Sequence, residues 1–299
     1  MPLHWHPCGL LNGKPTHPYA IIVLNQPVNE RALDAVIGSA SLLVCADGGA
    51  NRLYKCEHDN GHGHGHVAKL VNGSQTPSHV SHRLPDAIVG DLDSLEKEVE
   101  EYYRSCAVQV VRDPDQYSTD FTKCLKYIRK WATTHRQHSH GEDDTLDVVV
   151  LGGLGGRVDQ GFSQIHHLFM AENDPSLLKG RIYLLSEQSL SFVLSSFSAA
   201  SSSSTTSEAR IDRNTNIIHL EPGYFAENVG ILPVLGRTWL TTRGLEWDVE
   251  NWPTQFGGQL STSNHIRADK IEISFEGPRP LFTLELDKRL TTAGHLGFP

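Results

Sequence analysis

Short apolar runs alternate with amphipathic stretches over the first 187 residues of the chain. The runs are continuous and rich in β-branched residues, which is typical of strands buried on both faces of a parallel sheet. They occupy residues 19–24, 41–45, 87–89, 107–111, 146–151 and 182–186. The stretches between them predict helices over residues 29–37, 95–104, 120–131 and 159–171. The pattern therefore predicts an α/β unit built on a mainly parallel sheet.

The pattern changes beyond residue 187 to short apolar segments separated by turns. Closely spaced segments of this kind are typical of antiparallel sheets. The predicted strands cover residues 191–194, 216–220, 230–235, 237–241, 271–275 and 281–286. We therefore predict two domains: an α/β N-terminal domain with a mainly parallel sheet over residues 1–187, and a small antiparallel β-sandwich domain over residues 188–299.

Three polar insertions interrupt these patterns. Residues 57–84 are rich in Gly and His, residues 133–144 are polar, and residues 195–207 form a Ser-rich, low-complexity tract. We predict loops over all three, with the Ser-rich tract disordered. The histidines of the first loop either bind a transition metal or are only solvated, and we favour the second interpretation. They are His58, His62, His64 and His66.

Composition limits the classes of function. At 299 residues, with 38% hydrophobic and 20% charged residues, the chain matches a soluble globular protein. No apolar run approaches the roughly 18 residues of a membrane span, and the first residues do not resemble a secretory signal, so we predict a cytoplasmic protein without membrane contact. The net charge of −9 argues against nucleic-acid binding. Five scattered cysteines argue against a disulfide framework and a zinc site.

The clearest candidate chemistry lies in GDLDS at residues 90–94, where a predicted strand ends in two carboxylates. Side chains on a strand alternate with a period of two, so Asp91 and Asp93 are expected to leave it on the same side. Two such carboxylates repel each other unless a cation lies between them. Mg²⁺ takes one or two carboxylates together with phosphate oxygens. The alternative is a polar turn that caps the next helix, since Asp and Ser are common N-cap residues.

Two further segments place polar groups at a strand end and a helix start. Asp47, Gly48 and Gly49 follow the second strand, where paired glycines either let a ligand approach the backbone or only form a tight turn. Asp120 and Lys123 lie three residues apart, on one helical face near the positive end of a helix. They suit a metal and a phosphate; the alternative is an ordinary ion pair in the first turn.

A glycine-rich turn, LGGLGGRVDQ at residues 151–160, joins a predicted strand to a helix. It matches neither common nucleotide fingerprint, because position 158 is Val and no Gly-Lys-Ser/Thr follows. Even so, the glycines, Arg157 and the helix start offer backbone N–H groups and a guanidinium to an anion. The glycines are Gly152, Gly153, Gly155 and Gly156.

The C-terminal half contains one candidate ring pocket. GLEW at residues 244–247 supplies Trp247, whose face suits a flat or cationic ring. STSN at residues 261–264 supplies small polar groups from Ser261, Ser263 and Asn264. A purely structural Trp is the commoner meaning of such a residue.

Taken together, these stretches resemble thiamine pyrophosphokinases of the eukaryotic type. The match spans nearly the whole chain outside the three insertions and follows the order of the family's motifs. The matching stretches are CADGGANRLY (45–54), GDLDS (90–94), DQYSTDFTK (115–123), LGGLGGRVDQ (151–160), GILPV (230–234), GLEW (244–247) and STSN (261–264).

The resemblance implies an α/β catalytic domain that binds ATP and Mg²⁺, followed by a β-sandwich domain that binds thiamine. It implies transfer of the diphosphoryl group of ATP to the hydroxyl of thiamine, which gives thiamine diphosphate and AMP. It also implies a homodimer whose active sites are shared between chains.

The same resemblance assigns the candidate site residues. The implied catalytic residues are Asp91, Asp93, Asp120, Lys123 and Arg157, of which the three aspartates hold the metal. The implied nucleotide-binding residues are Asp47, Gly48, Gly49, Asp115, Gly152, Gly153, Gly155, Gly156 and Asp159. The implied thiamine-binding residues are Trp247, Ser261, Ser263 and Asn264.

Two other functions stay open at this point. One is a non-catalytic nucleotide- or metal-sensing protein, and the other is an ATP-dependent kinase of another small alcohol. The basic residues Lys123 and Arg157 beside the acidic positions favour an enzyme over a sensor. Product analysis separates the two enzymes, because diphosphoryl transfer gives AMP whereas a simple kinase gives ADP.

Overall fold

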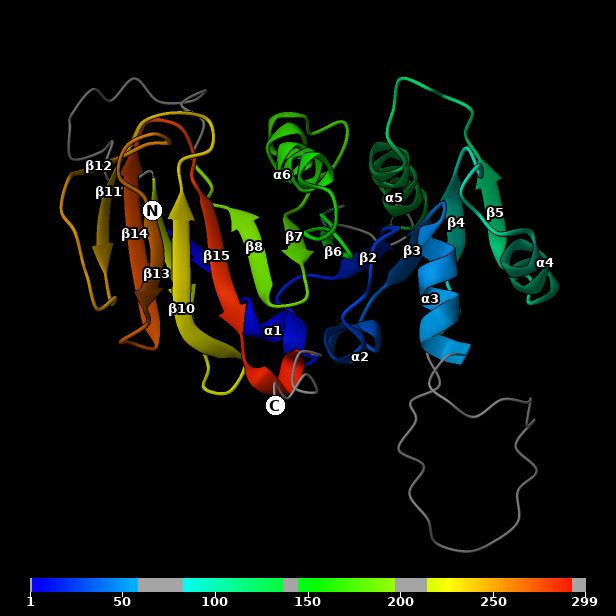
Figure 1. The fold of residues 1–299 in the computed structure, drawn as a ribbon, viewed down its shortest axis with the longest axis horizontal. Coiled ribbons are helices and arrows are strands. Elements are labelled where there is room, and N and C mark those ends of the chain that lie inside the picture. Colours follow the sequence, from blue (N-terminus) through cyan, green and yellow to red (C-terminus); the bar gives the residue numbers. More distant parts are fainter. Residues whose placement is uncertain (1, 59–82, 137–144, 197–213, 292–299) are drawn as a thin grey trace, which may run out of the picture.

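Two β-sheets organise the computed structural model, which describes residues 2–58, 83–136, 145–196 and 214–291 (Figure 1). In the N-terminal part the strands are β2 (Tyr19–Val23), β3 (Leu42–Ala46), β4 (Ala87–Gly90), β5 (Gln109–Arg112), β6 (Asp147–Leu151) and β7 (Ile182–Leu185). They pair in the order β7-β6-β2-β3-β4-β5, and all these pairs are parallel. Every residue of β2, β3 and β6 is buried, as continuous apolar runs predict.

Helices cover both faces of this parallel sheet. The helices α2 (Glu30–Ile37), α3 (Gly49–His58) and α4 (Lys97–Ser105) share a core with one face. The helices α5 (Asp120–Arg136) and α6 (Val158–Asn173) pack on the other, as Figure 1 shows. Since α3, α5 and α6 each follow a strand, they begin at the carboxyl edge of the sheet, which is where open α/β sheets bind ligands.

The C-terminal part extends the same sheet. Strand β8 (Ser189–Val193) runs antiparallel to β7, and β15 (Leu281–Leu286), β10 (Phe225–Leu232) and β13 (Ser261–His265) continue beyond it. One sheet therefore contains strands from both sides of residue 187. The predicted domain boundary at that residue stays a prediction.

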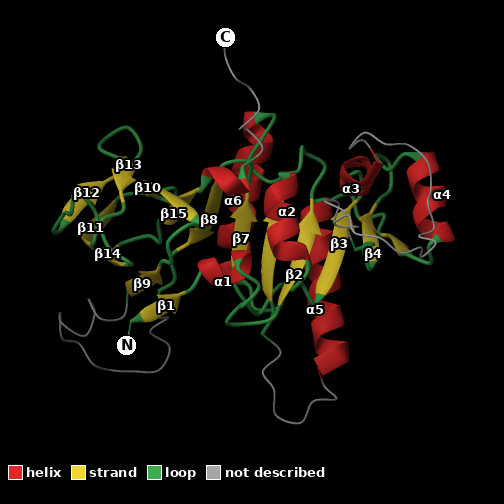
Figure 2. Ribbon diagram, turned by 90° about the horizontal axis from the view of Figure 1, so that it is seen from below, coloured by secondary structure: helices red, strands yellow, loops and turns green. Residues whose placement is uncertain are grey.

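A second sheet packs against this extension, and Figure 2 shows it at the end of the molecule away from α4. It contains β1 (Leu3–Trp5), β9 (Thr215–His219), β14 (Lys270–Glu276), β11 (Thr238–Arg243) and β12 (Trp252–Thr254), in that order. Ile231 and Phe282 of the large sheet share one core with Ile218 and Ile273 of the small one. The layered β arrangement predicted for this part is present.

The N-terminal strand β1 belongs to the C-terminal sheet. It pairs parallel with β9, and its Trp5 is fully buried. The indole N–H of Trp5 donates to Oδ1 of Asn216 at 2.8 Å, and the ring stacks on Phe192 with centroids 4.4 Å apart. Residues at the start of the chain thus complete a sheet formed mainly by its end.

The predicted fold class is confirmed: an α/β N-terminal part is followed by a β-rich part. Two loop predictions need correction, because α3 continues to His58 and α5 to Arg136, into the predicted loops 57–84 and 133–144. The remainder of those insertions, apart from residues 83 and 84, and nearly all of the Ser-rich tract lie outside the described residues. No helix in the described part of the chain is long and apolar enough to cross a membrane.

Candidate active site

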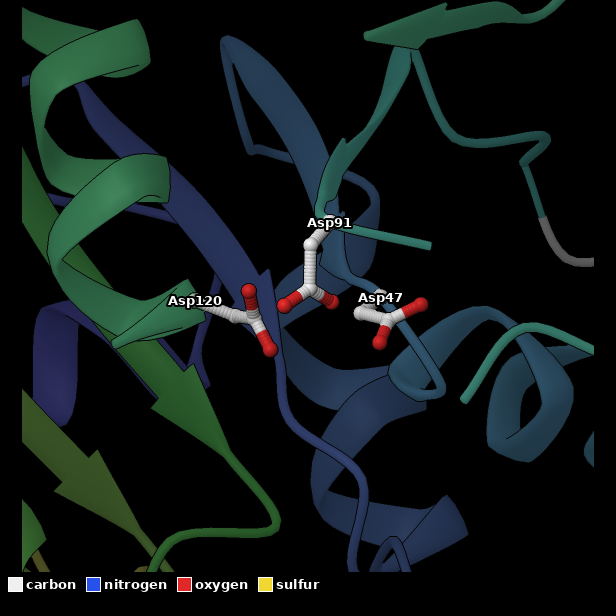
Figure 3. A group of neighbouring side chains, drawn as sticks. All are labelled: Asp47, Asp91 and Asp120. Carbon is white, nitrogen blue, oxygen red and sulfur yellow. The ribbon is translucent and has the colours of Figure 1, made fainter. Parts of the chain in front are cut away.

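Three carboxylates converge at the carboxyl edge of the sheet (Figure 3). Asp47 follows β3, Asp91 follows the neighbouring strand β4, and Asp120 is the first residue of α5. Each of the three offers a carboxylate oxygen, and these oxygens lie within 4.8 Å of one another. Adjacent parallel strands end side by side, so the topology itself brings Asp47 and Asp91 together.

Asp47 is held in an unusual position. Its φ is 45°, in the left-handed region that Asp tolerates better than most residues, and the residue is 2% exposed. The Ser94 backbone N–H donates to Oδ2 at 3.1 Å, whereas Oδ1 is buried without a hydrogen-bond partner among the described residues. Position 90 must be glycine here, because a Cβ on Gly90 would lie 2.7 Å from that of Asp47.

The carboxylates differ in their affinity for protons. Burial raises the pKa of Asp47 to about 6, and the negative charges of Asp120 and Asp93 act in the same direction. Burial also opposes ionisation of Asp91. The pKa of Asp91 is nevertheless lowered. The Gln116 amide donates to Oδ2 of Asp91 at 3.0 Å, and this bond and the charge of Lys123 outweigh burial.

Lys123 is the cation that partly balances this cluster. It is 3% exposed, and its Nζ donates to Oδ1 of Asp120 at 3.0 Å and lies 3.8 Å from Oδ2 of Asp91. Burial acts to lower the pKa of Lys123, but the two carboxylates outweigh it and raise the pKa, so the side chain is charged. Asp120 and Lys123, which were predicted to share one helical face, therefore form an ion pair, and this pair is part of the carboxylate cluster.

The donor set fits a hard divalent cation. Three carboxylates face one lysine, all the candidate ligands are oxygens, and the buried Oδ1 of Asp47 has no hydrogen-bond partner in the described part of the chain. An unpaired buried acceptor is costly, and oxygen ligands are what Mg²⁺ and Ca²⁺ prefer. The residues that would hold such a cation are Asp47, Asp91 and Asp120.

Asp93 and Asp115 take other positions. Strand alternation was the reason for expecting Asp91 and Asp93 on the same side, and that reason is wrong, because β4 ends at Gly90 and Leu92 has φ of 68°. Asp93 accepts from the Ser94 hydroxyl at 2.9 Å and lies beside the cluster, so its part in metal binding stays a prediction. Asp115 accepts from the Ser118 hydroxyl at 2.6 Å and braces the turn before α5.

A hollow of about 320 Å³ opens beside Asp47 and Asp120. Asn25 and Gln26 line it from the loop after β2, and one face of α6 lines it from the other side. Sequence reasoning missed both groups. The α6 residues are spaced as one helical face, and Asn25 follows a predicted strand, so both signals were present. The α6 residues are Gln160, Ser163, Gln164 and His167.

The glycine-rich turn does not line this hollow but packs against residues that do. Gly152 and Gly156 pack against Gln26, and Gly153 lies beside Gln164. The hollow includes Gly48, whereas its neighbour Gly49 lies against the backbone of β2, where a Cβ would come 2.0 Å from the Val23 carbonyl oxygen. Nothing lies close to the Cβ position of Gly155 within the described residues.

Arg157 and Asp159 point to solvent rather than into the hollow. Their side chains form an ion pair at 2.6 Å and are 75% and 62% exposed. Neither residue lines the hollow. The two hydrogen bonds of the pair come from Nε and Nη2 of Arg157.

A second hollow, of about 210 Å³, lies between strands of the C-terminal part. Trp247, Ser261 and Asn264 line it as predicted, together with Trp252, which sequence reasoning missed. The Asn264 side chain accepts from the Trp247 N–H at 3.2 Å and donates to the Trp247 carbonyl at 3.0 Å, and so fixes the loop. Ser263 is exposed, has φ of 55°, and does not line this hollow.

Comparison with known proteins matches both halves of the chain. The family profile "Thiamin pyrophosphokinase, catalytic domain" matches residues 33–178, and the profile "Thiamin pyrophosphokinase, vitamin B1 binding domain" matches residues 215–279. These two ranges contain the carboxylate hollow and the Trp247 hollow respectively, apart from Leu24, Asn25 and Gln26.

Individual relatives agree with the profiles. Thiamine pyrophosphokinase 3 of Oryza sativa subsp. japonica is 32% identical over 86% of this chain and 82% of its own length. Thiamine pyrophosphokinase of Saccharomyces cerevisiae is 30% identical over 83% and 79%. The solved structure of yeast thiamin pyrophosphokinase superposes with a TM-score of 0.73 at 24% identity, covering 95% of this chain and 91% of that one, and so supports the fold.

The unsatisfied Asp47 predicts a stability change. The pKa of Asp47 is raised from 3.8 to about 6 in the folded chain, so its charge destabilises the metal-free fold increasingly as pH rises through that window. Asp47→Asn keeps the shape and tolerates the left-handed backbone. We expect it to raise the unfolding midpoint of the metal-free protein at pH 7.5 by about 2–4 °C.

Thermal unfolding in EDTA measures this effect. At pH 4 the difference should disappear, because Asp47 is then largely protonated in the wild type. Asp115→Asn is the matched control: hydrogen bonds from Ser118 and Tyr117 lower the pKa of Asp115, so its loss should not stabilise the fold. A lower midpoint for Asp47→Asn at pH 7.5 would contradict the unsatisfied carboxylate.

Proposed function

Because the chain belongs to the thiamine pyrophosphokinase family and is an enzyme of that class, we propose that ATP is its diphosphoryl donor and that transfer takes place at the carboxylate hollow. Thiamine is the acceptor, and Mg²⁺ is the metal. We also propose that the protein is cytoplasmic. Residues 1–187 form the catalytic unit in this proposal, and residues 188–299 form the thiamine-binding unit.

The observation that carries the proposal is the cluster of Asp47, Asp91 and Asp120. Their oxygens lie within 4.8 Å of one another, and one buried oxygen, Oδ1 of Asp47, accepts no hydrogen bond from the residues that the structure describes. A triphosphate is itself highly negative, so an acidic hollow binds it only when a cation lies between the two sets of oxygens. Mg²⁺ held by these residues would supply positive charge to the phosphate oxygens.

The reaction joins the hydroxyl oxygen of thiamine to the β-phosphorus of ATP. The bond between that phosphorus and the oxygen bridging to the α-phosphorus breaks, AMP leaves, and a carboxylate of the hollow accepts the hydroxyl proton. The remaining work is positioning and charge stabilisation. Lys123 lies at the cluster and adds positive charge, as do the backbone N–H groups at the start of α5.

Arg157 and Asp93 keep the roles that the family resemblance implies. For Arg157, which forms an exposed ion pair with Asp159 and does not line the hollow, the role requires its side chain to turn toward the bound phosphates. For Asp93, its position next to Asp47 and its bond to Ser94 are compatible with a ligand that joins when the cation binds. The glycines of the turn after β6 do not line the hollow, and their implied role in nucleotide binding rests on their contacts with Gln26 and Gln164, which do line it.

Thiamine is proposed to bind at Trp247, in an active site shared by two chains. Figure 1 places β11 and β12 at one end of the long axis and α5 well toward the other, which separates the two hollows within one chain. Apolar side chains are exposed near both: Phe162 on α6 is 57% exposed, and Trp247 is 55% exposed. A symmetric dimer would cover both patches and bring each Trp247 hollow to the partner's carboxylates.

Product analysis tests the proposed reaction. Purified protein with Mg²⁺, ATP and thiamine should form AMP and thiamine diphosphate in equal amounts, and EDTA should stop the reaction.

Asp120→Asn should lower kcat by about 100-fold or more, because it removes charge from the cluster while keeping its shape. Asp269→Asn, at an exposed position, is the control and should behave as wild type. Formation of ADP in place of AMP would favour a simple kinase, and absence of turnover a sensor.

Mixed dimers test the shared site. Chains carrying Asp91→Asn are co-expressed with chains carrying Trp247→Ala, each inactive alone. In a mixed dimer one site receives both changes and the other neither, and random assembly makes half of the dimers mixed. Activity should therefore return to about a quarter of wild type. No recovery, with mixed dimers verified by pull-down through two different tags, would mean that each active site lies within one chain.

A further inference from the structure

The hollow extends beyond the carboxylates to a buried glutamine that the reaction leaves unused. Gln164 lies on α6 and lines the same hollow as Asp47 and Asp120. It is 8% exposed, and its Oε1 has no hydrogen-bond partner among the described residues. A buried amide oxygen without a partner loses its water without compensation, which is why such groups usually meet a ligand donor.

The described groups around Gln164 bond to one another, and none of them bonds to its Oε1. The Ser163 carbonyl accepts from Nδ1–H of His167 at 2.6 Å, so Nε2 of His167 carries the lone pair. That nitrogen accepts from the hydroxyls of Thr119 at 2.8 Å or Thr122 at 3.0 Å. The ring also stacks on Phe121, with centroids 4.6 Å apart. These contacts tie α6 to the start of α5 and form a fixed wall beside Gln164.

We propose that Gln164 recognises the amino-pyrimidine edge of the adenine of ATP. This proposal rests on the proposed function, since it takes the carboxylate end of the hollow as the site of the phosphates. The Oε1 atom accepts from the 6-amino group, and the amide N–H donates to an adjacent ring nitrogen, in the same donor and acceptor pattern that Gln uses toward the 6-amino group and N7 of adenine. Guanine presents a carbonyl oxygen where adenine presents its amino group, so Oε1 would face another acceptor.

Thiamine carries the same chemistry in its own aminopyrimidine ring. We assign Gln164 to ATP because the hollow that it lines also contains Asp47 and Asp120, whereas the proposed thiamine ring site is the separate hollow at Trp247. The experiment therefore includes one arm for each source of the amino group.

The test removes the amide from the protein and the amino group from the ligand in turn. KM is measured for ATP and for purine riboside triphosphate, which lacks the 6-amino group, with wild type and Gln164→Met. Wild type should show a KM about ten-fold higher for the analogue. Gln164→Met should raise the KM for ATP by about ten-fold and bring the ratio of the two constants to about one. Its kcat at saturating ATP and its KM for thiamine should stay within about two-fold of wild type.

Controls separate a binding role from a structural one. The unfolding midpoint of Gln164→Met should equal or exceed that of wild type, because an unpaired buried acceptor is replaced by an apolar group of similar shape. If Gln164→Met does not fold, Gln164→Leu replaces it in the same comparison. Gln188→Met, at an exposed glutamine in the turn between β7 and β8, should keep the wild-type ratio.

Three results would overturn the assignment. The first is an unchanged preference for ATP in folded Gln164→Met. The second is a wild type that does not discriminate against the analogue. The third is a variant that loses discrimination against a thiamine analogue lacking the amino group of its pyrimidine. Failure of the proposed function is visible separately, because wild type would then form no AMP from ATP and thiamine.

Discussion

The site depends on one constraint, which is that three carboxylates are held closer together than their charges favour. Asp47, Asp91 and Asp120 offer oxygens within 4.8 Å of one another, and Lys123 supplies a compensating positive charge. Repulsion of this kind in a partly buried site is relieved either by a proton or by a cation. Burial, reinforced by the charges of Asp120 and Asp93, raises the pKa of Asp47 to about 6 and so favours the proton, and a bound divalent metal is the other solution.

The fold supplies the rigidity that keeps the cluster assembled. The neighbouring parallel strands β3 and β4 end side by side, and both are buried in the sheet. The left-handed backbone of Asp47 and the absence of a side chain at Gly90 then let the carboxylates approach. His167 and Phe121 fix α6 against the start of α5 and so complete the wall of the hollow. The stable sheet thus holds the carboxylates together despite their repulsion, which a bound cation would relieve.

Residues whose role follows from local pattern could be predicted, and those defined by contacts in space could not. Asp91 and Asp120 could be named as candidates because a strand end and a helix start are visible in sequence, and the structure brings them together. The central place of Asp47 depends on a left-handed φ and on which strands are neighbours. The ion pair between Arg157 and Asp159 likewise could not be predicted from the spacing of the motifs. Strands β1 and β13 were missed because one has three residues and the other, STSNH, is polar.

Proton release on metal binding tests the carboxylate cluster most directly. Mn²⁺ is titrated calorimetrically into metal-free protein at pH 6 and pH 8, each in two buffers of different ionisation enthalpy. A carboxyl with pKa of about 6 should release roughly half a proton per bound ion at pH 6 and none at pH 8. Asp47→Asn should abolish that release. Mn²⁺ binding at pH 6 with the same proton release in wild type and in Asp47→Asn would contradict a metal site built on Asp47.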